Sequence, residues 1–256
     1  MKRNVSLLKR RIVQLLSECR LVASGHLGFS LSSDWDSHAY LLHSGSEAVL
    51  IDTGSGRDVD ATGDRIAEAL EGRELVAIVL THSHVDHSGG AAAISERFGA
   101  PVHAHPIAQE WLLTGDEDAI GLPQARAAGV YPPDQVLAPV SRVLPIGDSI
   151  VVGDLELRAH RTPGHSVDHV VYTAELGAGL AMFSGDLVFA QGRVAILDTP
   201  DSDVVRYEES IRAMNRLRPD LLFPGHGAVV LARGGAHLAA AVAAYDRGDQ
   251  PVGLIA

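Results

Sequence analysis

Apolar positions along the chain recur in short runs separated by turn residues, the pattern typical of strands that are buried on one or both faces. Twelve such runs are expected to be strands, although the first fits the opening of an N-terminal helix equally well. They cover residues 12–16, 20–23, 39–42, 48–51, 75–80, a short stretch near 102, 142–144, 149–152, 155–160, 170–173, 180–183 and 221–223. The runs 39–42 and 48–51 are close enough in the sequence to form a hairpin around Ser44-Gly45-Ser46.

Other segments have the period of an amphipathic helix, with apolar residues three and four positions apart. Helices are expected over 58–70, near 90–98, and over 107–113, 204–217 and 238–245. The stretch 114–139 is rich in Gly and Pro and reads as a long connection on the substrate side, with at most one helical turn. One strand-rich, helix-covered half follows another, which predicts an α+β fold of two packed sheets with helices outside.

The composition of the chain excludes several classes of protein and of site. The chain has 256 residues, 46% hydrophobic, with a formal charge of −11 and a single cysteine. This excludes a mainly disordered chain, an intrachain disulfide framework and zinc sites built on several cysteines. The acidic balance disfavours nucleic acid as a partner, because phosphate binding needs a basic surface. No apolar stretch is long enough to span a bilayer and the basic start lacks an apolar signal core, so a cytoplasmic protein is expected.

The unusual feature of the composition is its 13 histidines. The strand 75–80 runs directly into a segment with four potential metal ligands in six residues: His82, His84, Asp86 and His87. In an extended segment His82 and His84 would point to one face. Four such residues at a strand end have no packing reason to coincide. Imidazole and carboxylate ligands suit zinc, and iron and manganese accept them too.

Three later segments also place a potential ligand after a strand and beside a glycine. They are Pro163-Gly164-His165, Ser184-Gly185-Asp186 and Pro224-Gly225-His226. Each alone would be an ordinary turn, but their order after the dense cluster indicates one composite site. A glycine lets the backbone pass close to a crowded site.

With these residues in place, the sequence resembles the metallo-β-lactamase-fold hydrolases. The segment His82-Ser83-His84-Val85-Asp86-His87, followed by His165, Asp186 and His226, matches their HxHxDH…H…D…H signature. Asp52 matches the first, strand-terminal Asp of that superfamily. The match runs from about 50 to 227. It implies a four-layer αββα sandwich with the metals at one edge of the two sheets, in a single domain over 1–256.

The resemblance also implies a role for each ligand. His82, His84 and His165 would hold one metal ion, and Asp86, His87 and His226 a second. Asp186 would bridge the two ions, which are expected to be zinc, although iron or manganese would fit. Asp52 would orient a ligand or the glycine-rich turn without binding a metal itself. The alternative is that it only caps the end of its strand.

The chemistry expected of such a site is hydrolysis, with Asp86 and Asp186 as catalytic residues. A hydroxide bridging the two metals would attack a small carboxylic ester, thioester or lactone. True β-lactamases typically lack the bridging carboxylate, so antibiotic hydrolysis is not the first expectation. The alternatives are a phosphodiesterase or nuclease with the same two-metal site, and a glutathione-linked, iron-dependent sulfur dioxygenase. A binding scaffold that has lost catalysis is disfavoured, because it would not need all seven ligands.

Residues that would contact a small-molecule substrate are weakly indicated. Phe189 and Arg193 lie just beyond the bridging Asp, and Trp35 and Trp111 could supply an apolar wall with the 114–139 connection. Cys19 lies outside every motif and reads as structural. Relatives often form homodimers, although no stripe in this sequence indicates one.

Overall fold

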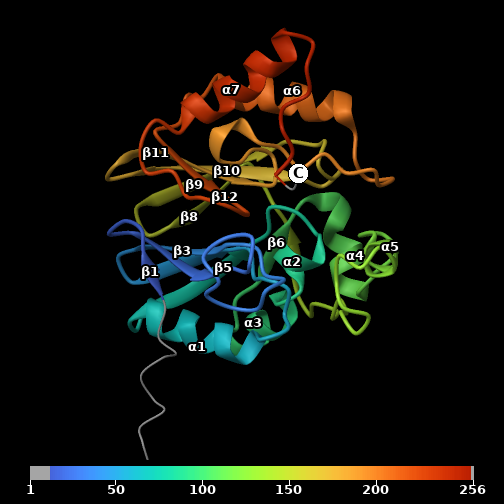
Figure 1. The fold of residues 1–256 in the computed structure, drawn as a ribbon. Helices are drawn as coiled ribbons and strands as arrows, with labels where there is room; N and C mark the ends of the chain where they lie inside the picture. The colour runs from blue at the N-terminus through green and yellow to red at the C-terminus, as the bar shows by residue number, and fades with distance from the viewer. Residues whose placement is uncertain (1–11, 255–256) are drawn as a thin grey trace, which may run out of the picture.

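The computed structural model describes residues 12–254, and it forms two β-sheets packed face to face with helices on both outer sides (Figure 1). The first sheet has seven strands in the order β1-β2-β3-β4-β5-β6-β7. Its strands are β1 Val13–Gln14, β2 Cys19–Ala23, β3 Ala39–Ser44, β4 Glu47–Ile51, β5 Glu74–Val79, β6 Val102–Ala104 and β7 Val143–Pro145. Strands β1 to β4 are antiparallel, and β4 to β7 are parallel.

The second sheet has five strands in the order β12-β11-β10-β9-β8. Its strands are β8 Ser149–Val152, β9 Leu155–Arg161, β10 Val170–Leu176, β11 Gly179–Gly185 and β12 Leu221–Pro224. Strands β8 to β11 form an antiparallel meander, and β12 joins β11 in parallel after a helical crossover. The crossover helix and the last helix, α6 Val204–Asn215 and α7 Gly235–Asp246, cover the outer face of this sheet.

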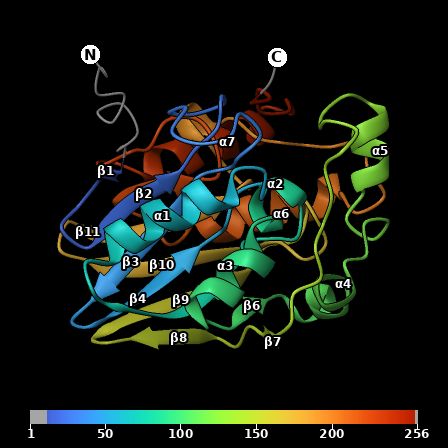
Figure 2. The same cartoon turned by 90° about the horizontal axis from the view of Figure 1, so that it is seen from below.

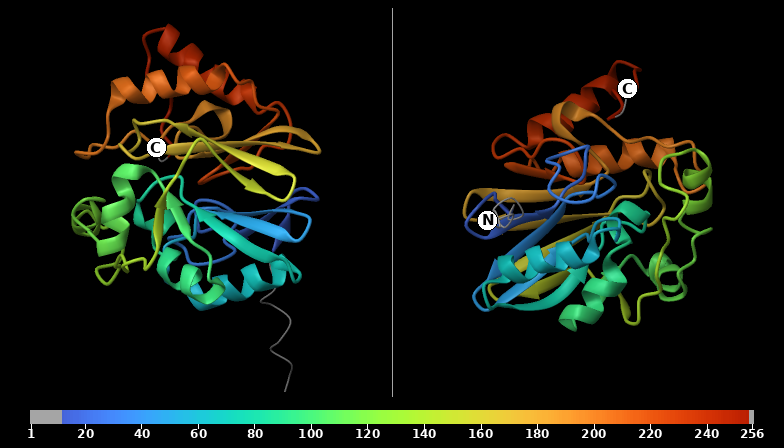
Figure 3. Two further views of the ribbon diagram at one scale, coloured as in Figure 1. Left: turned by 180° about the vertical axis from the view of Figure 1, so that it is seen from behind. Right: turned by 60° about the horizontal axis from the view of Figure 1, so that its bottom comes forward.

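The helices of the first half are α1 Val59–Leu70, α2 Val85–Ser88, α3 Ala91–Phe98, α4 Gln109–Thr114 and α5 Leu122–Ala127. Helices α1 and α3 lie across the outer face of the first sheet, and α4 and α5 lie at one side of the molecule (Figure 2). The same four layers are visible from behind and from an oblique angle (Figure 3). No helix within residues 12–254 is long and apolar enough to cross a membrane.

Alternation of side chains along the central strands generates three separate cores. On β4, Ala48 and Leu50 face the helices of the first half, whereas Val49 and Ile51 face the other sheet. Successive residues of a strand point to opposite faces, so a strand covered on both sides must be apolar throughout. This burial on both faces explains the continuous apolar runs in the sequence and confirms the αββα layering.

The two sheets meet at an aromatic cluster. Phe183 of β11 stacks on Phe223 of β12 with ring centroids 4.8 Å apart, and Tyr40 of β3 packs edge-on against both. The Tyr40 hydroxyl donates to the carbonyl of Pro224 at 2.6 Å. This contact fixes the start of the loop that carries His226.

Most predicted elements are present, with differences at their ends. The predicted strand 12–16 is paired only at Val13–Gln14, and the basic start over 1–11 lies outside the described residues. The helix expected from 107 begins with a 3-10 turn, Pro106–Ala108, because proline fits the first turn of a helix. The long connection contains α5, and the short helix α2 within the histidine cluster was not expected.

Truncation of the aromatic cluster should destabilise the whole fold. Phe183 is almost fully buried, so Phe183→Ala leaves a cavity between the sheets and should lower the free energy of unfolding by about 3–5 kcal/mol. Urea denaturation followed by circular dichroism measures this loss. The control is Val151→Ala on β8, whose residue is 66% exposed and which should change stability by less than about 0.5 kcal/mol. Equal effects of the two substitutions would contradict the assignment of this cluster as the inter-sheet core.

Candidate metal centre

All the potential metal ligands lie in segments that follow strands at one edge of the sandwich, five of them in loops and Asp86 and His87 on α2. The loop after β5 carries His82 and His84 and runs into α2. The loops after β9, β11 and β12 carry His165, Asp186 and His226. Because β5 belongs to the first sheet and the other three strands to the second, the two sheets together build the site.

The loop after β12 passes very close to Asp186 and His87. A Cβ atom at Gly225 would lie 2.3 Å from Oδ1 of Asp186 and 2.7 Å from Cε1 of His87. Any side chain there would have to displace two of the candidate ligands, so only glycine fits beside His226.

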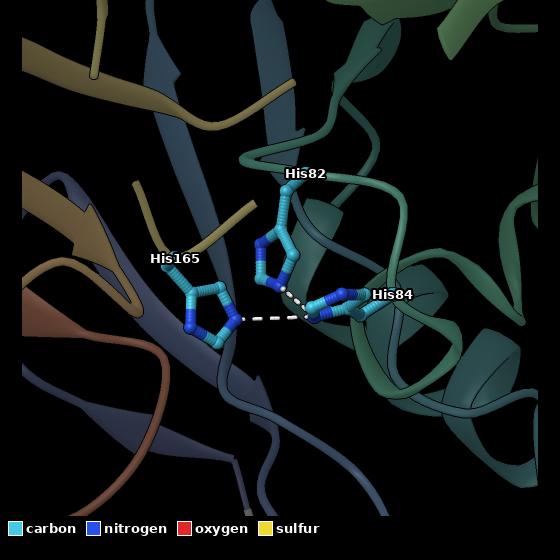
Figure 4. A group of neighbouring side chains, drawn as sticks. All are labelled: His82, His84 and His165. Carbon is cyan, nitrogen blue, oxygen red and sulfur yellow. Dashed lines mark hydrogen bonds between the residues drawn. The ribbon is translucent and has the colours of Figure 1, made fainter. Parts of the chain in front are cut away.

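Three histidines form the first group of candidate ligands. Nδ1 of His84 lies 3.1 Å from Nε2 of His82 and 3.1 Å from Nε2 of His165. Figure 4 shows the three rings, from two separate loops, turned toward one another. The rings of His82 and His165 each stand nearly edge-on to that of His84, at 79° and 77°.

The outer nitrogens of two of these rings have partners that assign their protons. Nε2 of His84 donates to Oδ2 of Asp201 at 2.9 Å, and Nδ1 of His165 donates to the carbonyl of Ala195 at 2.7 Å. A neutral imidazole carries one N–H, so the inward nitrogens of both rings hold lone pairs.

Asp52 and Thr81 assign the protons of the remaining rings in the same way. Oδ2 of Asp52 accepts from Nδ1 of His87 at 2.8 Å and from the Thr81 hydroxyl at 2.8 Å. Because that hydroxyl donates to Asp52, its oxygen accepts from Nδ1 of His82 at 3.1 Å. When these two rings are neutral, the inward Nε2 atoms of His82 and His87 therefore also hold lone pairs. Asp52 occupies the left-handed backbone region, with φ of 60°, which Asp tolerates better than most residues.

The second group of candidate ligands consists of Asp86, His87 and His226. Oδ2 of Asp86 lies 3.1 Å from Nε2 of His226 and 3.5 Å from Nε2 of His87. In each of the two groups the ligand atoms all lie within 4.8 Å of one another. All three residues of this second group are buried.

Asp186 lies between the two groups. Its Oδ1 is 3.4 Å from Nε2 of His87, and its Oδ2 is 3.6 Å from Nε2 of His226 and 3.8 Å from Nε2 of His165. One carboxylate is thus within reach of both groups. The structure brings together all seven ligands that the sequence indicates.

The residues present fit divalent cations. Nε2 of His87 and Oδ1 of Asp186 are buried without a hydrogen-bond partner among residues 12–254, which is costly unless something else binds them. Burial lowers the pKa of His165 to about 4 and holds the pKa of His82 well below its usual range, so both are neutral, the state that binds a metal. Imidazole nitrogens and carboxylate oxygens are ordinary zinc ligands.

The carboxylates make the second group strongly attractive to positive charge. Although burial opposes protonation, Asp86, Asp186 and Asp52 together hold the pKa of His87 well above its usual range. In the absence of a cation the same field would retain a proton at the place where a metal ligand is needed. A divalent ion satisfies this field without protonating the ring.

Four residues that hold the ligands were not assigned from the sequence. Asp201 accepts from His84, and the Tyr131 hydroxyl donates to Oδ1 of Asp86 at 2.7 Å. Asp168 accepts from the backbone N–H of Ser83 at 2.8 Å and from the Ser166 hydroxyl at 2.7 Å, which joins the two histidine loops.

The fourth of these residues is His169, which lies four positions after His165. Its Nδ1 donates to Thr162 Oγ1, and its Nε2 accepts from the backbone N–H of Asp186 at 3.1 Å. The position of His169 beside the His165 loop was a signal for such a role, whereas Tyr131 and Asp201 lie in segments without any motif.

A cavity of about 770 Å³ opens onto the candidate ligands. Trp35 lines it, but the other residues expected to contact substrate lie outside its lining. Phe189 is buried behind His226, with ring centroids 6.3 Å apart. Arg193 donates through Nη1 to the carbonyl of Gly253 at 3.1 Å, and Trp111 packs against the core beneath the first sheet. These three side chains are held by the fold itself, which corrects their expected place on the cavity wall.

Comparison with known proteins identifies the family. A model of the metallo-beta-lactamase superfamily matches residues 33–226. The chain belongs to this superfamily. Superfamily membership and the seven-ligand cluster identify the chain as a metal-dependent hydrolase.

Individual members of the superfamily are similar over most of the chain. An uncharacterised protein of Aquifex aeolicus is 32% identical over 70% of this chain and 78% of its own length. An atrochrysone carboxyl ACP thioesterase of Aspergillus fumigatus is 29% identical over 75% of this chain, but the match spans only 51% of that enzyme. The crystal structure of the BLEG-1 B3 metallo-beta-lactamase superposes with a TM-score of 0.61 at 30% identity, covering 76% of this chain and 88% of that one.

Removal of the Asp201 carboxylate should weaken metal binding. Asp201→Ala deletes the acceptor that orients His84, and loss of such a partner typically costs 10–100-fold in metal affinity. Competition with a chromophoric chelator measures the affinity for Zn²⁺. The matched control is Asp198→Ala in the same loop, an exposed residue that should leave the affinity unchanged. Equal losses in both variants would show that the loop, rather than the hydrogen bond, is responsible.

Proposed function

We propose that this hydrolase uses two divalent ions, Zn²⁺ in the simplest case, to hydrolyse a small carboxylic ester, thioester or lactone. The observation that carries the two-ion part is the position of Asp186, whose carboxylate lies within 3.8 Å of nitrogens from both ligand groups. One group would hold an ion through His82, His84 and His165, and the other through Asp86, His87 and His226.

Bound ions supply a nucleophile at neutral pH by lowering the pKa of water, and they polarise the substrate's carbonyl oxygen. The protein residues hold this chemistry in place. Asp186 would neutralise charge between the two groups. Asp86 is oriented by the Tyr131 hydroxyl, which donates to Oδ1 and leaves Oδ2 beside Nε2 of His226 in the second group. The orientation of Asp86 therefore depends on a residue from the long connection.

The choice of an acyl substrate rests on two further observations. The fungal relative that matches over three quarters of this chain is named as a thioesterase. The chain's formal charge of −11 also disfavours polyanionic nucleic acid, so a nuclease is the weaker alternative. The ions themselves would be the main positive charges of the site.

Loss of the shared carboxylate should abolish turnover. We expect metal analysis of the purified protein to find two equivalents per chain, and Asp186→Ala to lower kcat/KM at least about a hundredfold, because both ions lose a ligand. Asp118→Ala, at an exposed position, is the control and should retain full activity. Full activity in Asp186→Ala would overturn the proposed site.

A substrate panel distinguishes the proposed reaction from its rivals. The metal-loaded enzyme is assayed on an aryl ester, a thioester, a lactone, bis-nitrophenyl phosphate, a cephalosporin, and glutathione persulfide with oxygen consumption recorded. We expect the three acyl substrates to be hydrolysed at least tenfold faster than the others. Preference for the phosphodiester or the cephalosporin, or oxygen uptake with one iron per chain, would replace the proposal by the corresponding activity.

A further inference from the structure

The cavity above the metal centre is much larger than a reacting carbonyl group needs. Its volume of about 770 Å³ is that of a pocket for a whole small molecule, and five candidate ligands form its floor. A substrate whose carbonyl reaches the ligands must therefore fill the remaining space with another part of its structure.

That remaining space is walled by apolar side chains from three segments. Helix α5 and the residues around it form one wall, the loop after η2 (Ala190–Gly192) forms a second, and the C-terminal part of the described chain forms a third. The apolar lining residues of these walls are Ile120, Leu122, Ala125, Ala128, Val130, Val194, Ile196, Leu197, Pro251 and Leu254.

No lysine or arginine of the described residues lines this cavity. The arginines of neighbouring segments are engaged elsewhere. Arg57 pairs with Asp134 at 2.9 Å, and Arg126 of α5 pairs with Glu117 at 2.7 Å. Arg193 donates to a backbone carbonyl, as described above. An anionic group on the substrate would find no lysine or arginine partner in the lining.

Negative charge, by contrast, is present in the lining. Asp34 and Asp198 are exposed residues of the cavity lining. A carboxylate or phosphate on the distal end of a substrate would lie in an acidic, partly apolar space, where like charges repel and desolvation is costly.

From the lining and its charges we infer that the cavity selects an uncharged hydrocarbon chain on the ester or thioester. This inference rests on the proposed function and names its substrate class: the carbonyl is directed to the ligands, and the chain packs against α5 and the loop 194–197. Selectivity against anionic chains comes from Asp34 and Asp198 together with the lack of a lining lysine or arginine among residues 12–254.

The test compares chains that differ in length or in one terminal charge. p-Nitrophenyl acetate, hexanoate and mono-adipate share the reacting bond, and the adipate differs from the hexanoate by a terminal carboxylate in place of a methyl group. Each buried methylene contributes up to about fourfold, so kcat/KM for hexanoate should exceed that for acetate at least about tenfold. The kcat/KM for hexanoate should also exceed the kcat/KM for adipate at least about tenfold. A parallel series of alkyl acetates shows whether the chain is accepted on the alcohol side instead.

Two variants of α5 locate the chain. Ala125→Phe fills the cavity and should remove the advantage of hexanoate while changing the rate with acetate less than about threefold. Ala127→Phe is the matched control, because Ala127 is exposed on the same helix and lies outside the lining. A third variant, Leu197→Lys, adds a cation to the lining and should shift the hexanoate-to-adipate ratio at least about fivefold toward adipate.

Binding of the free acids separates this inference from the proposed reaction. Calorimetry with the metal-loaded protein should show hexanoate binding at least about tenfold tighter than adipate, and Ala125→Phe should abolish the difference. If the acids show this preference but no ester is cleaved, the proposed function fails and the chain-binding cavity stands. Equal binding of hexanoate and adipate, or an equal loss for acetate and hexanoate in Ala125→Phe, would overturn the inference even if esters are hydrolysed.

Discussion

Imidazole lone pairs that face one another at about 3 Å repel unless a cation lies between them. In this protein the outer nitrogens of His82, His84 and His165 each have a partner that holds the proton on the outside, so all three lone pairs point inward. The site therefore has its lowest energy only with positive charge inside it. Most features of the surrounding structure can be understood as means of keeping these nitrogens together against that repulsion.

A few strong contacts between the two sheets hold these nitrogens together. Asp168 joins the loop after β5 to the loop after β9, and Tyr40 of the aromatic cluster fixes β12 against the first sheet. Neither ligand loop can move away without breaking a buried hydrogen bond, which costs more than an exposed one. Metal binding and the packing of the sandwich are thus stabilised by the same residues.

The sequence predicts the parts of this arrangement that depend on local spacing. His82, His84, Asp86 and His87 are recognisable because they lie within six residues, and the central strands because burial on both faces makes them apolar throughout. The four-layer arrangement and the roles of His165, Asp186 and His226 followed from the resemblance to a family rather than from periodicity. Tyr131 and Asp201 could not be predicted, because their approach to the ligands is set by the path of two irregular segments. Arg193 and Trp111 lie outside the cavity lining because Arg193 donates to the carbonyl of Gly253 and Trp111 packs against the core of the first half.

The apolar walls of the cavity come from segments that contribute no strand to either sheet. Substitutions in α5 or in the loop 194–197 can accordingly reshape the space offered to a substrate while the strands and their ligands stay as they are. Tyr131, Asp201 and the backbone carbonyl of Ala195 couple these segments to the ligands, through one hydrogen bond each. An ancestor with this frame could acquire new specificities by exchanging two loops, provided that these three contacts were retained. Directed evolution of the enzyme would best begin with libraries confined to the same two segments.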